Sequence, residues 1–296
     1  MINIDNNTKV IDQDSEYFPQ GLFNLLDCPV RLYALGNKAL LKKMCIAIAG
    51  TRSCSDFGKS LAKKFSNKLS AYNVTIISGM ADGIDENAHF GTFGCGSTIA
   101  VVAGGFKEIL RGNRLKRARE ILNNNGLIIS EYHPDFTVRK GMFLQRNRLI
   151  AAIASATIII EAPLDSGAVN TAHHALRLNR PLYVVPWSLN YSKGEGCNTL
   201  LNEGAKPLID INNLLIDLHI VSTQTEIDLS IKKPDNSQIP DEYLKYYEYI
   251  KQNAPCQLES IVDNFNEDFI GNIISTLTYM ELNNYIKQSD KGYYTS

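Results

Sequence analysis

The run Cys45-Ile46-Ala47-Ile48-Ala49-Gly50-Thr51-Arg52-Ser53 identifies the architecture of this chain. Its first five residues are apolar, as in a buried strand, and Gly50 interrupts the run before a helical pattern over 56–72. A helix N-terminus leaves backbone N–H groups without intrahelical partners, and these groups favour an anion. The planar, permanently charged guanidinium of Arg52 suits phosphate. The run therefore predicts a phosphate-binding corner between a strand and a helix.

The alternation of apolar strand and helical pattern continues to about residue 209. Strands are predicted at 45–49, 74–78, 98–103, 127–130, 157–161 and 181–185. Helices are predicted at 56–72, 83–93, 113–124, 143–154 and 166–178. The strands are nearly continuous in Val and Ile, which is typical of strands covered on both faces. The pattern predicts an α/β fold with a doubly wound, mostly parallel sheet and right-handed crossovers.

The glycine-rich segments follow the predicted strands. They are Gly50-Thr51-Arg52, Ser78-Gly79-Met80-Ala81-Asp82-Gly83, Gly104-Gly105 and Ser166-Gly167. Ligands of doubly wound sheets bind beyond the carboxyl ends of the strands. We therefore expect the functional site at this edge of the sheet.

The remaining segments complete the predicted organisation. Residues 1–44 are expected to form an N-terminal arm that packs on a sheet domain spanning 45–221, and the polar residues 222–238 to form a linker. Residues 239–296 predict helices at 241–252, 257–265 and 267–282 and two short strands around the turn Ser289-Asp290-Lys291-Gly292. This is the outline of a small winged-helix-like domain.

The composition is that of an ordinary globular protein, with 44% hydrophobic residues. No apolar run approaches the roughly 20 residues that span a membrane, and the first residues show no signal-peptide pattern. None of the six cysteines forms a CxxC pair, so we expect reduced thiols rather than disulfides or metal ligands. These features predict a cytoplasmic protein without a membrane partner, metal or cofactor.

Charge is distributed unevenly, although the net charge is only −1. Residues 106–148 hold ten Lys and Arg against four Asp and Glu, a net charge of +6. Residues 210–296 hold 14 acids against 6 bases, a net charge of −8. The two parts are therefore expected to meet different partners.

A set of ordered motifs runs through the predicted sheet domain. They are Gly50-Thr51-Arg52-Ser53-Cys54-Ser55-Asp56-Phe57-Gly58, Ser78-Gly79-Met80-Ala81-Asp82-Gly83-Ile84-Asp85-Glu86-Asn87-Ala88-His89, Ser130-Glu131-Tyr132-His133-Pro134, Phe143-Leu144-Gln145-Arg146-Asn147-Arg148-Leu149-Ile150-Ala151, Glu161-Ala162, Ser166-Gly167, Thr171-Ala172 and Asn198-Thr199-Leu200-Leu201-Asn202-Glu203-Gly204-Ala205. From residue 17 to about 209 the chain resembles the DNA-processing protein A family (DprA, also called Smf). It departs from the family at Pro186-Trp187, where the family usually has Pro-Gly.

The resemblance implies an extended Rossmann-like domain that forms a homodimer and binds single-stranded DNA. It also implies a mediator role: the protein would protect incoming strands and help load the recombinase RecA during natural transformation. The family's role is binding, so no enzymatic activity is expected.

The candidate DNA-binding residues begin at the strand–helix corner. Arg52 is expected to hold a phosphate there with Gly50, Ser53 and Ser55, and Ser55 or Asp56 to cap the helix. The alternative for Arg52 is a salt bridge that ties down its own loop.

A second candidate is Lys140 with Phe143, because single strands favour a cation for phosphate and a ring for a splayed base. Some family members use a Lys and a Phe at this spacing. The alternative for Phe143 is a core position at the start of its helix.

Further candidates are Arg114, Arg146, Asn147, Arg148, Ser166 and Gly167. Successive residues of a helix point about 100° apart, so we expect one of Arg146 and Arg148 to reach DNA and the other to form structural salt bridges. Arg114 and three other cations lie at the start of a predicted helix, where positive charge opposes the helix dipole. This mild cost indicates an anionic partner; the alternative is a solvated helix face. Ser166 and Gly167 are expected to supply N–H donors to the same region.

Asp82, Asp85 and His89 resemble a catalytic group but lack a nucleophile or third ligand at a suitable spacing. Helix capping and internal hydrogen bonds are the preferred interpretation.

Two other hypotheses remain open. The glycine-rich corners also suit a protein that binds or processes mononucleotides. The acidic C-terminal domain lacks the charge for DNA binding by counterion release, so a protein contact or a dimer-stabilising role is expected for it.

Overall fold

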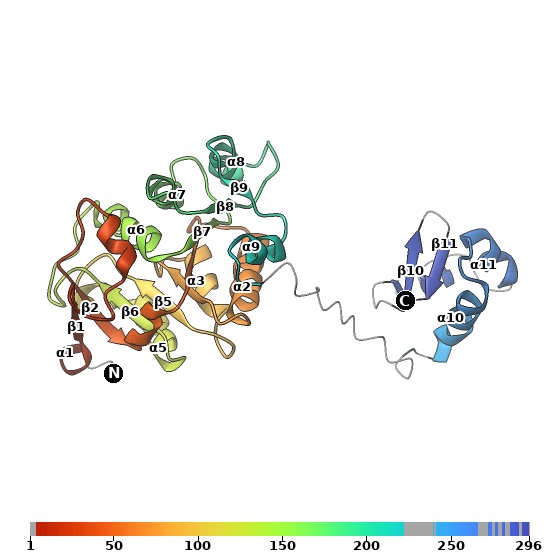
Figure 1. Cartoon of the computed structure of the whole chain (residues 1–296), viewed down its shortest axis with the longest axis horizontal. Coiled ribbons are helices and arrows are strands. Elements are labelled where there is room, and N and C mark those ends of the chain that lie inside the picture. Colours follow the sequence, from red (N-terminus) through yellow and green to blue (C-terminus); the bar gives the residue numbers. More distant parts are fainter. Residues whose placement is uncertain are drawn as a thin grey trace. The chain divides into compact units, whose positions relative to one another are not determined.

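In the computed structural model, nine strands form the sheet of the N-terminal part of the chain (Figure 1). The structure describes residues 4–221, 239, 241–265, 272–273, 276–277, 280–281, 285–289 and 292–295. The chain divides into two units, Met1–Ile220 and Val221–Ser296. The predicted linker, 222–238, lies outside the described residues and stays a prediction.

The strands of the sheet are β1 (Lys9–Asp12), β2 (Arg31–Gly36), β3 (Cys45–Ala49), β4 (Thr75–Ser78), β5 (Thr98–Val101), β6 (Leu127–Ser130), β7 (Ala156–Ile159), β8 (Leu182–Val184) and β9 (Lys206–Pro207). The helices of this unit are α1 (Ile4–Asn7), α2 (Asp56–Ser70), α3 (Ile84–Phe90), α4 (Phe106–Ile109), α5 (Gly112–Asn123), α6 (Met142–Ile153), α7 (Gly167–Arg177), α8 (Glu195–Asn202) and α9 (Ile211–Asp217). Short 3-10 helices are η1 (Gln20–Asn24), η2 (Lys38–Lys42) and η3 (Ser192–Gly194).

The strand order is β1-β2-β6-β5-β4-β3-β7-β8-β9, and the pairs from β6 to β9 are parallel. From β3 the chain moves outward through β4, β5 and β6, and then returns to β7 on the other side of β3. The connections therefore diverge between β3 and β7. In an open α/β sheet this point of divergence is where a crevice forms and ligands bind.

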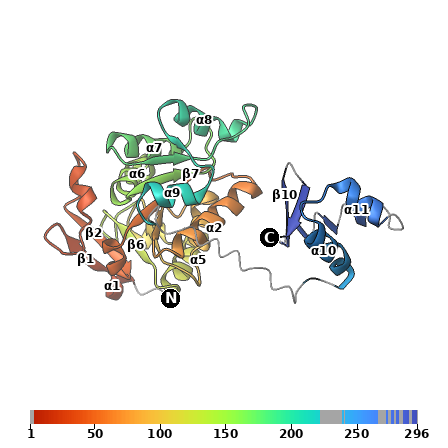
Figure 2. The ribbon, with the colours of Figure 1, turned by 45° about the vertical axis from the view of Figure 1, so that its right-hand side comes forward.

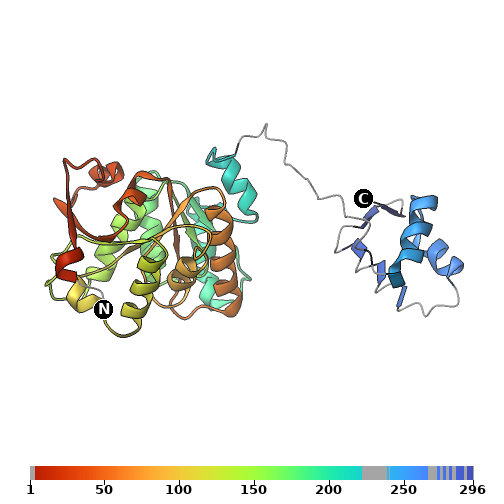
Figure 3. The same cartoon turned by 90° about the horizontal axis from the view of Figure 1, so that it is seen from below.

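All six predicted strands are present, and the extended Rossmann-like, doubly wound fold is confirmed. Every residue of β3 through β8 is buried. Side chains alternate between two cores: Ile99 and Val101 pack with residues of α6, whereas Ala100 packs with residues of α5. Seen from below, helices flank the sheet on both sides (Figure 3).

The N-terminal segment contributes two strands that the sequence analysis missed. β2 pairs antiparallel with β6, with Ala34 opposite Ile129, and β1 pairs antiparallel with β2. Both lie at the end of the sheet opposite β8 (Figures 1 and 2). An antiparallel edge on a parallel sheet is common, but such short strands give little sequence signal of their own.

The second unit contains α10 (Asp241–Asn253), α11 (Leu258–Asn264) and a hairpin of β10 (Ile286–Ser289) and β11 (Gly292–Thr295). It has its own core, which includes Ile250, Ile261 and Ile286. The predicted helix at 267–282 lies mostly outside the described residues; positions 272–273, 276–277 and 280–281 are described and are helical. Among the described residues of the whole chain, no helix is long and apolar enough to span a membrane.

Candidate nucleic-acid interface

A pocket of about 360 Å³ opens at the carboxyl ends of β3 and β7, at the point where the chain connections diverge. It is lined by the loop after β3, by the loop after β4 and the start of α3, by α6, and by the loop after β7 and the start of α7. The predicted site residues in its lining are Gly50, Arg52, Phe143, Arg146, Asn147, Ser166 and Gly167. The sheet topology thus gathers residues from three separate sequence motifs.

Loop 50–55 is held in place by Glu161, a fully buried residue just beyond β7. The Thr51 N–H donates to the Glu161 carbonyl at 2.6 Å. The Glu161 carboxylate accepts from the Ser55 N–H at 3.0 Å and from its hydroxyl at 2.7 Å. The Ser55 hydroxyl also accepts from the N–H of Gly58 at 3.0 Å, which caps α2 as predicted.

These contacts differ from the predicted phosphate-binding role of Ser55. The N-terminus of α2 holds a carboxylate from the protein itself, so the Ser55 N–H and hydroxyl already have an anionic acceptor. Ser53, by contrast, is exposed on the same loop, and its N–H is 3.4 Å from the Thr51 hydroxyl oxygen. The sequence analysis missed Glu161 as the residue that positions the loop; its only signal was a carboxylate at the end of a buried strand.

Two arginines contact the ring of Phe143, which lines the pocket. The guanidinium carbon of Arg52 is 5.6 Å from the centroid of the Phe143 ring, and that of Arg114 is 5.5 Å from it. Both distances are within the range of cation–π contacts. Lys140 is exposed in the turn immediately before α6, whose N-cap is Gly141. The structure therefore brings the two predicted segments, around Arg52 and Lys140, to one region.

Arg146 forms the buried floor of the pocket. Its Nη1 donates to the Val101 carbonyl at 2.6 Å, whereas its buried Nε has no hydrogen-bond partner. The guanidinium packs directly against Gly79: a Cβ there would lie 1.9 Å from Nη1 and would displace it. Burial is the main cause that lowers the pKa of Arg146 to about 10; the charges of Arg52 and Arg114 act in the same direction, and Asp85 opposes them. Three guanidinium groups therefore repel one another at this site, and an anion would relieve that repulsion.

Asn147 joins the two helices that flank the pocket. Its side-chain amide donates to the Gly167 carbonyl at 2.9 Å, at the first residue of α7. Ser166 caps α7, because its hydroxyl accepts from the Val169 N–H at 3.3 Å. The N-terminus of this 11-residue helix faces the pocket, since Ser166, Gly167 and Ala168 line it. This end of the helix carries the positive end of the helix dipole.

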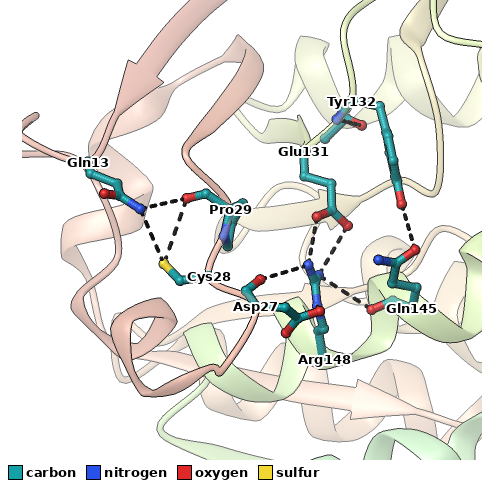
Figure 4. A network of polar contacts seen from close by, with 9 residues as sticks. Gln13, Asp27, Cys28, Pro29, Glu131, Tyr132, Gln145 and Arg148 are labelled. Atoms are coloured by element: carbon teal, nitrogen blue, oxygen red, sulfur yellow. Dashed lines mark hydrogen bonds and ion pairs between the residues drawn. The ribbon is translucent and has the colours of Figure 1, made fainter.

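Arg148 points away from the pocket into a polar network (Figure 4). Its Nε is 2.6 Å from an Asp27 carboxylate oxygen, and its Nη2 is 2.7 Å from a Glu131 carboxylate oxygen. Only 6% of the side chain is exposed. Burial lowers the pKa of the Arg148 guanidinium, but the hydrogen bonds to Glu131 and Asp27 outweigh burial and raise it. The assignment of Arg148 to the DNA-binding set is therefore corrected: it forms the structural salt bridges, and Arg146 faces the pocket.

Asp82, Asp85 and His89 have internal partners, as the sequence analysis preferred. Asp82 pairs with Arg117, and the Asp85 carboxylate accepts from the Gly79 N–H at 3.2 Å. His89 Nδ1 is 2.6 Å from the Thr98 hydroxyl. Burial raises the pKa of Asp85 and lowers that of His89 to about 3. A search of the described residues finds no group of His, Cys, Asp and Glu that could hold a metal ion.

In the folded chain, acidic side chains neutralise part of the positive charge of the basic segment 106–148. Lys107 pairs with Asp5 and Asp135, and Arg117 pairs with Asp82 and Glu86. Arg114 contacts the Phe143 ring and interacts electrostatically with Asp82 and Arg146. The positive charge that faces the pocket therefore comes from particular arginines rather than from the whole segment.

Comparison with known proteins identifies relatives of the sheet unit. The family model for DNA recombination-mediator protein A matches residues 9–219. DNA processing protein DprA of Streptococcus pneumoniae is 35% identical over 190 residues, which is 64% of this chain and 67% of that protein. Protein Smf of Synechocystis sp. is 33% identical over 217 residues, 72% of this chain and 54% of that protein.

Two solved structures share the fold. One is DNA processing protein A from Helicobacter pylori, described for its single-stranded DNA binding mode: the TM-score is 0.65 at 34% identity, covering 72% of this chain and 95% of that chain. The other is DprA from Streptococcus pneumoniae, with a TM-score of 0.65 at 30% identity, covering 71% of this chain and 74% of that chain.

Proposed function

We propose that this chain, which belongs to the DNA recombination-mediator protein A family, binds single-stranded DNA at the pocket between β3 and β7. The observation that carries the proposal is the gathering of Arg52, Arg114 and Arg146 around Phe143. Guanidinium groups bind phosphate, and an aromatic ring offers a face to an unpaired base. The relative from Helicobacter pylori supports the choice of single-stranded DNA.

The phosphate contacts are assigned to exposed groups at the mouth of the pocket. Arg52, Ser53 and Lys140 are exposed, and Arg114 is partly exposed. Gly50 lets loop 50–55 pack closely on α3, because a Cβ there would lie 2.4 Å from Ile84 Cγ1. Inside the pocket, the N-terminus of α7 and the unpartnered Nε of Arg146 are suited to accept an anionic or hydrogen-bond-accepting group.

The base contact is assigned to Phe143. Its ring is partly exposed and already flanked by two guanidinium groups, so a stacked base would lie within an aromatic and cationic environment. Stacking of this kind tolerates any base, because every base has a π-face. The proposal therefore includes little sequence preference.

The biological role follows the family. We assign to this chain a mediator role without catalysis, in which a homodimer protects incoming strands and helps load RecA during natural transformation. The internal partners of Asp82, Asp85 and His89 support a binding role. A cytoplasmic location agrees with the six free cysteines. The winged-helix-like interpretation of residues 239–296 belongs to the same proposal, with a protein contact or dimer stabilisation as its role.

The test is the salt dependence of oligothymidylate binding. The logarithm of the binding constant should fall linearly with the logarithm of salt concentration, by about 0.7 per phosphate contacted. Arg52→Ala and Lys140→Ala should weaken binding to all sequences and flatten the slope, whereas Arg177→Ala, at the far end of α7, should change neither. Wild-type binding by both of the first two variants would refute the site assignment.

The mononucleotide hypothesis is tested in parallel, because a pocket of about 360 Å³ has room for one nucleotide. Thermal unfolding is measured with mononucleotides and with oligonucleotides. Stabilisation by oligonucleotides alone supports the proposed function. A large stabilisation by mononucleotides alone would replace it with the mononucleotide hypothesis.

A further inference from the structure

Three aromatic rings from two distant segments form a continuous surface beside loop 50–55. The Phe57 ring, in the first turn of α2, meets the Trp187 ring edge-to-face, with centroids 5.7 Å apart and planes at 87°. Trp187 stacks on Tyr191, with centroids 4.8 Å apart and planes at 25°. We call Phe57, Trp187 and Tyr191 the aromatic ledge.

The aromatic ledge is joined to the loop by polar contacts. Tyr191 donates its hydroxyl hydrogen to the Glu161 carboxylate at 2.7 Å, and that carboxylate also holds Ser55. Lys193 Nζ donates to the Ser53 carbonyl at 2.7 Å. The acceptor for Lys193 is a neutral carbonyl, so this contact leaves its positive charge uncancelled. The ledge therefore continues directly from the loop that carries Arg52.

The polar atoms of the ledge are directed inward. Trp187 Nε1 donates to the Ile160 carbonyl at 2.7 Å, beyond the end of β7, so the indole is held by its edge. Phe57 has no polar atom to satisfy, yet 60% of the residue is exposed. A singly exposed apolar residue needs no explanation. Phe57 is an exposed ring that contacts Trp187, which in turn stacks on Tyr191, and the group lies beside Lys193 and loop 50–55. This is the composition of a stacking surface for single strands.

We propose that unpaired bases of a single strand leaving the pocket stack on the aromatic ledge, with Phe57 as the main contact. The proposal rests on the proposed function, since it extends the path of the same strand. Arg52 and Lys193 flank this path and supply charge for the phosphates, and the ledge supplies the apolar faces for the bases. The ligand class is single-stranded DNA with its bases free, rather than phosphate alone.

Trp187 is the single tryptophan of the chain, so its fluorescence reports on the aromatic ledge alone. An oligothymidylate should quench this emission as it saturates the protein, with saturation followed independently by anisotropy of a labelled strand. An abasic strand of the same length keeps the phosphates and lacks the bases, so it should bind more weakly and leave the emission unchanged. Equal quenching by the abasic strand, or saturation by oligothymidylate without quenching, would overturn the proposal.

Substitutions separate the ledge from the pocket. Phe57→Leu keeps an apolar side chain and should lower the affinity for oligothymidylate about tenfold, the effect of one lost stacking contact. Phe23→Leu, an exposed phenylalanine of η1, is the matched control and should bind as the wild type does. If Arg52→Ala weakens binding while Phe57→Leu binds as the wild type does, the pocket assignment is supported and the proposal for the aromatic ledge is refuted. If Arg52→Ala and Lys140→Ala both bind as the wild type does, the site assignment of the proposed function fails, whatever Phe57→Leu does.

Discussion

The Glu161 carboxylate accepts hydrogen bonds from both the N–H and the hydroxyl of Ser55, at 3.0 and 2.7 Å. A helix N-terminus that resembles a phosphate site in sequence is thus filled by an internal carboxylate. The consequence is a rigid loop 50–55, whose Arg52 side chain is presented to the pocket. The proposed anion contacts therefore lie on Arg52 and the other groups at the pocket rather than on the N-terminus of α2.

Glu161→Gln should destabilise the protein. The carboxylate accepts from the Ser55 N–H, the Ser55 hydroxyl and the Tyr191 hydroxyl, whereas an amide has one accepting oxygen and places an NH₂ group against a donor. A mismatched buried donor costs about 1–3 kcal/mol. Denaturant unfolding measures the change, and Glu195→Gln, at the exposed start of α8, is the control. Equal stability of Glu161→Gln and wild type would contradict this account of the loop.

Arg148→Ala should lower stability without changing the salt dependence of DNA binding. The substitution leaves Glu131, which is 9% exposed, without its main ionic partner. Removing one member of a buried ion pair costs about 3–5 kcal/mol. Unfolding and binding are measured on the same preparation, under conditions where the variant is folded. A reduced salt slope with unchanged stability would return Arg148 to the DNA-binding set.

The protein should lose stability below pH 6.5 through His89. Burial lowers the folded-state pKa of His89 to about 3, whereas the unfolded imidazole titrates near 6.5. Between these values the unfolded chain binds a proton that the folded chain does not, so the free energy of unfolding falls as the pH falls. At pH 5 the loss is about 2 kcal/mol.

The measurement compares denaturant unfolding at pH 7 and pH 5. His89→Gln should lose less stability over this interval than the wild type, by about the same 2 kcal/mol. His133→Gln, whose side chain is exposed, is the control and should follow the wild type. A wild-type pH dependence for His89→Gln would show that another group is responsible.

Deletion of residues 238–296 should leave single-strand affinity mostly intact. The deleted sequence from 239 onward holds nine acids and four bases, so it offers little counterion release. The proposed contacts lie in the sheet unit, which has its own hydrophobic cores. Binding is compared with the full chain at several salt concentrations, after thermal unfolding shows that the shortened chain is folded. Complete loss of binding would place an essential contact in the second unit.

Local pattern was enough to place strands β3 to β8 and helices α2, α3, α5, α6 and α7 of the sheet unit. The run at 45–49 and the helix start at Ser55 depend on neighbouring residues: buried apolar side chains form the strand, and a hydroxyl caps the helix. Order and spacing of the motifs were enough to identify the family. Strands β1 and β2 were missed because β2 is stabilised by pairing with β6 and β1 by pairing with β2, not by a pattern in their own residues.

The roles of particular side chains depended on contacts between distant segments. Ser55 and Glu161 are separated by 106 residues, so no local pattern showed that a carboxylate fills the N-terminus of α2. The sequence could not show which of Arg146 and Arg148 would face a ligand, because both lie on one helix. The packing of α6 places Arg146 in the pocket lining and Arg148 beside Asp27. Periodicity is a property of adjacent residues and can be read along the chain. The partner of a buried charge is set by which loops the sheet topology brings together, and that is known only once the chain is folded.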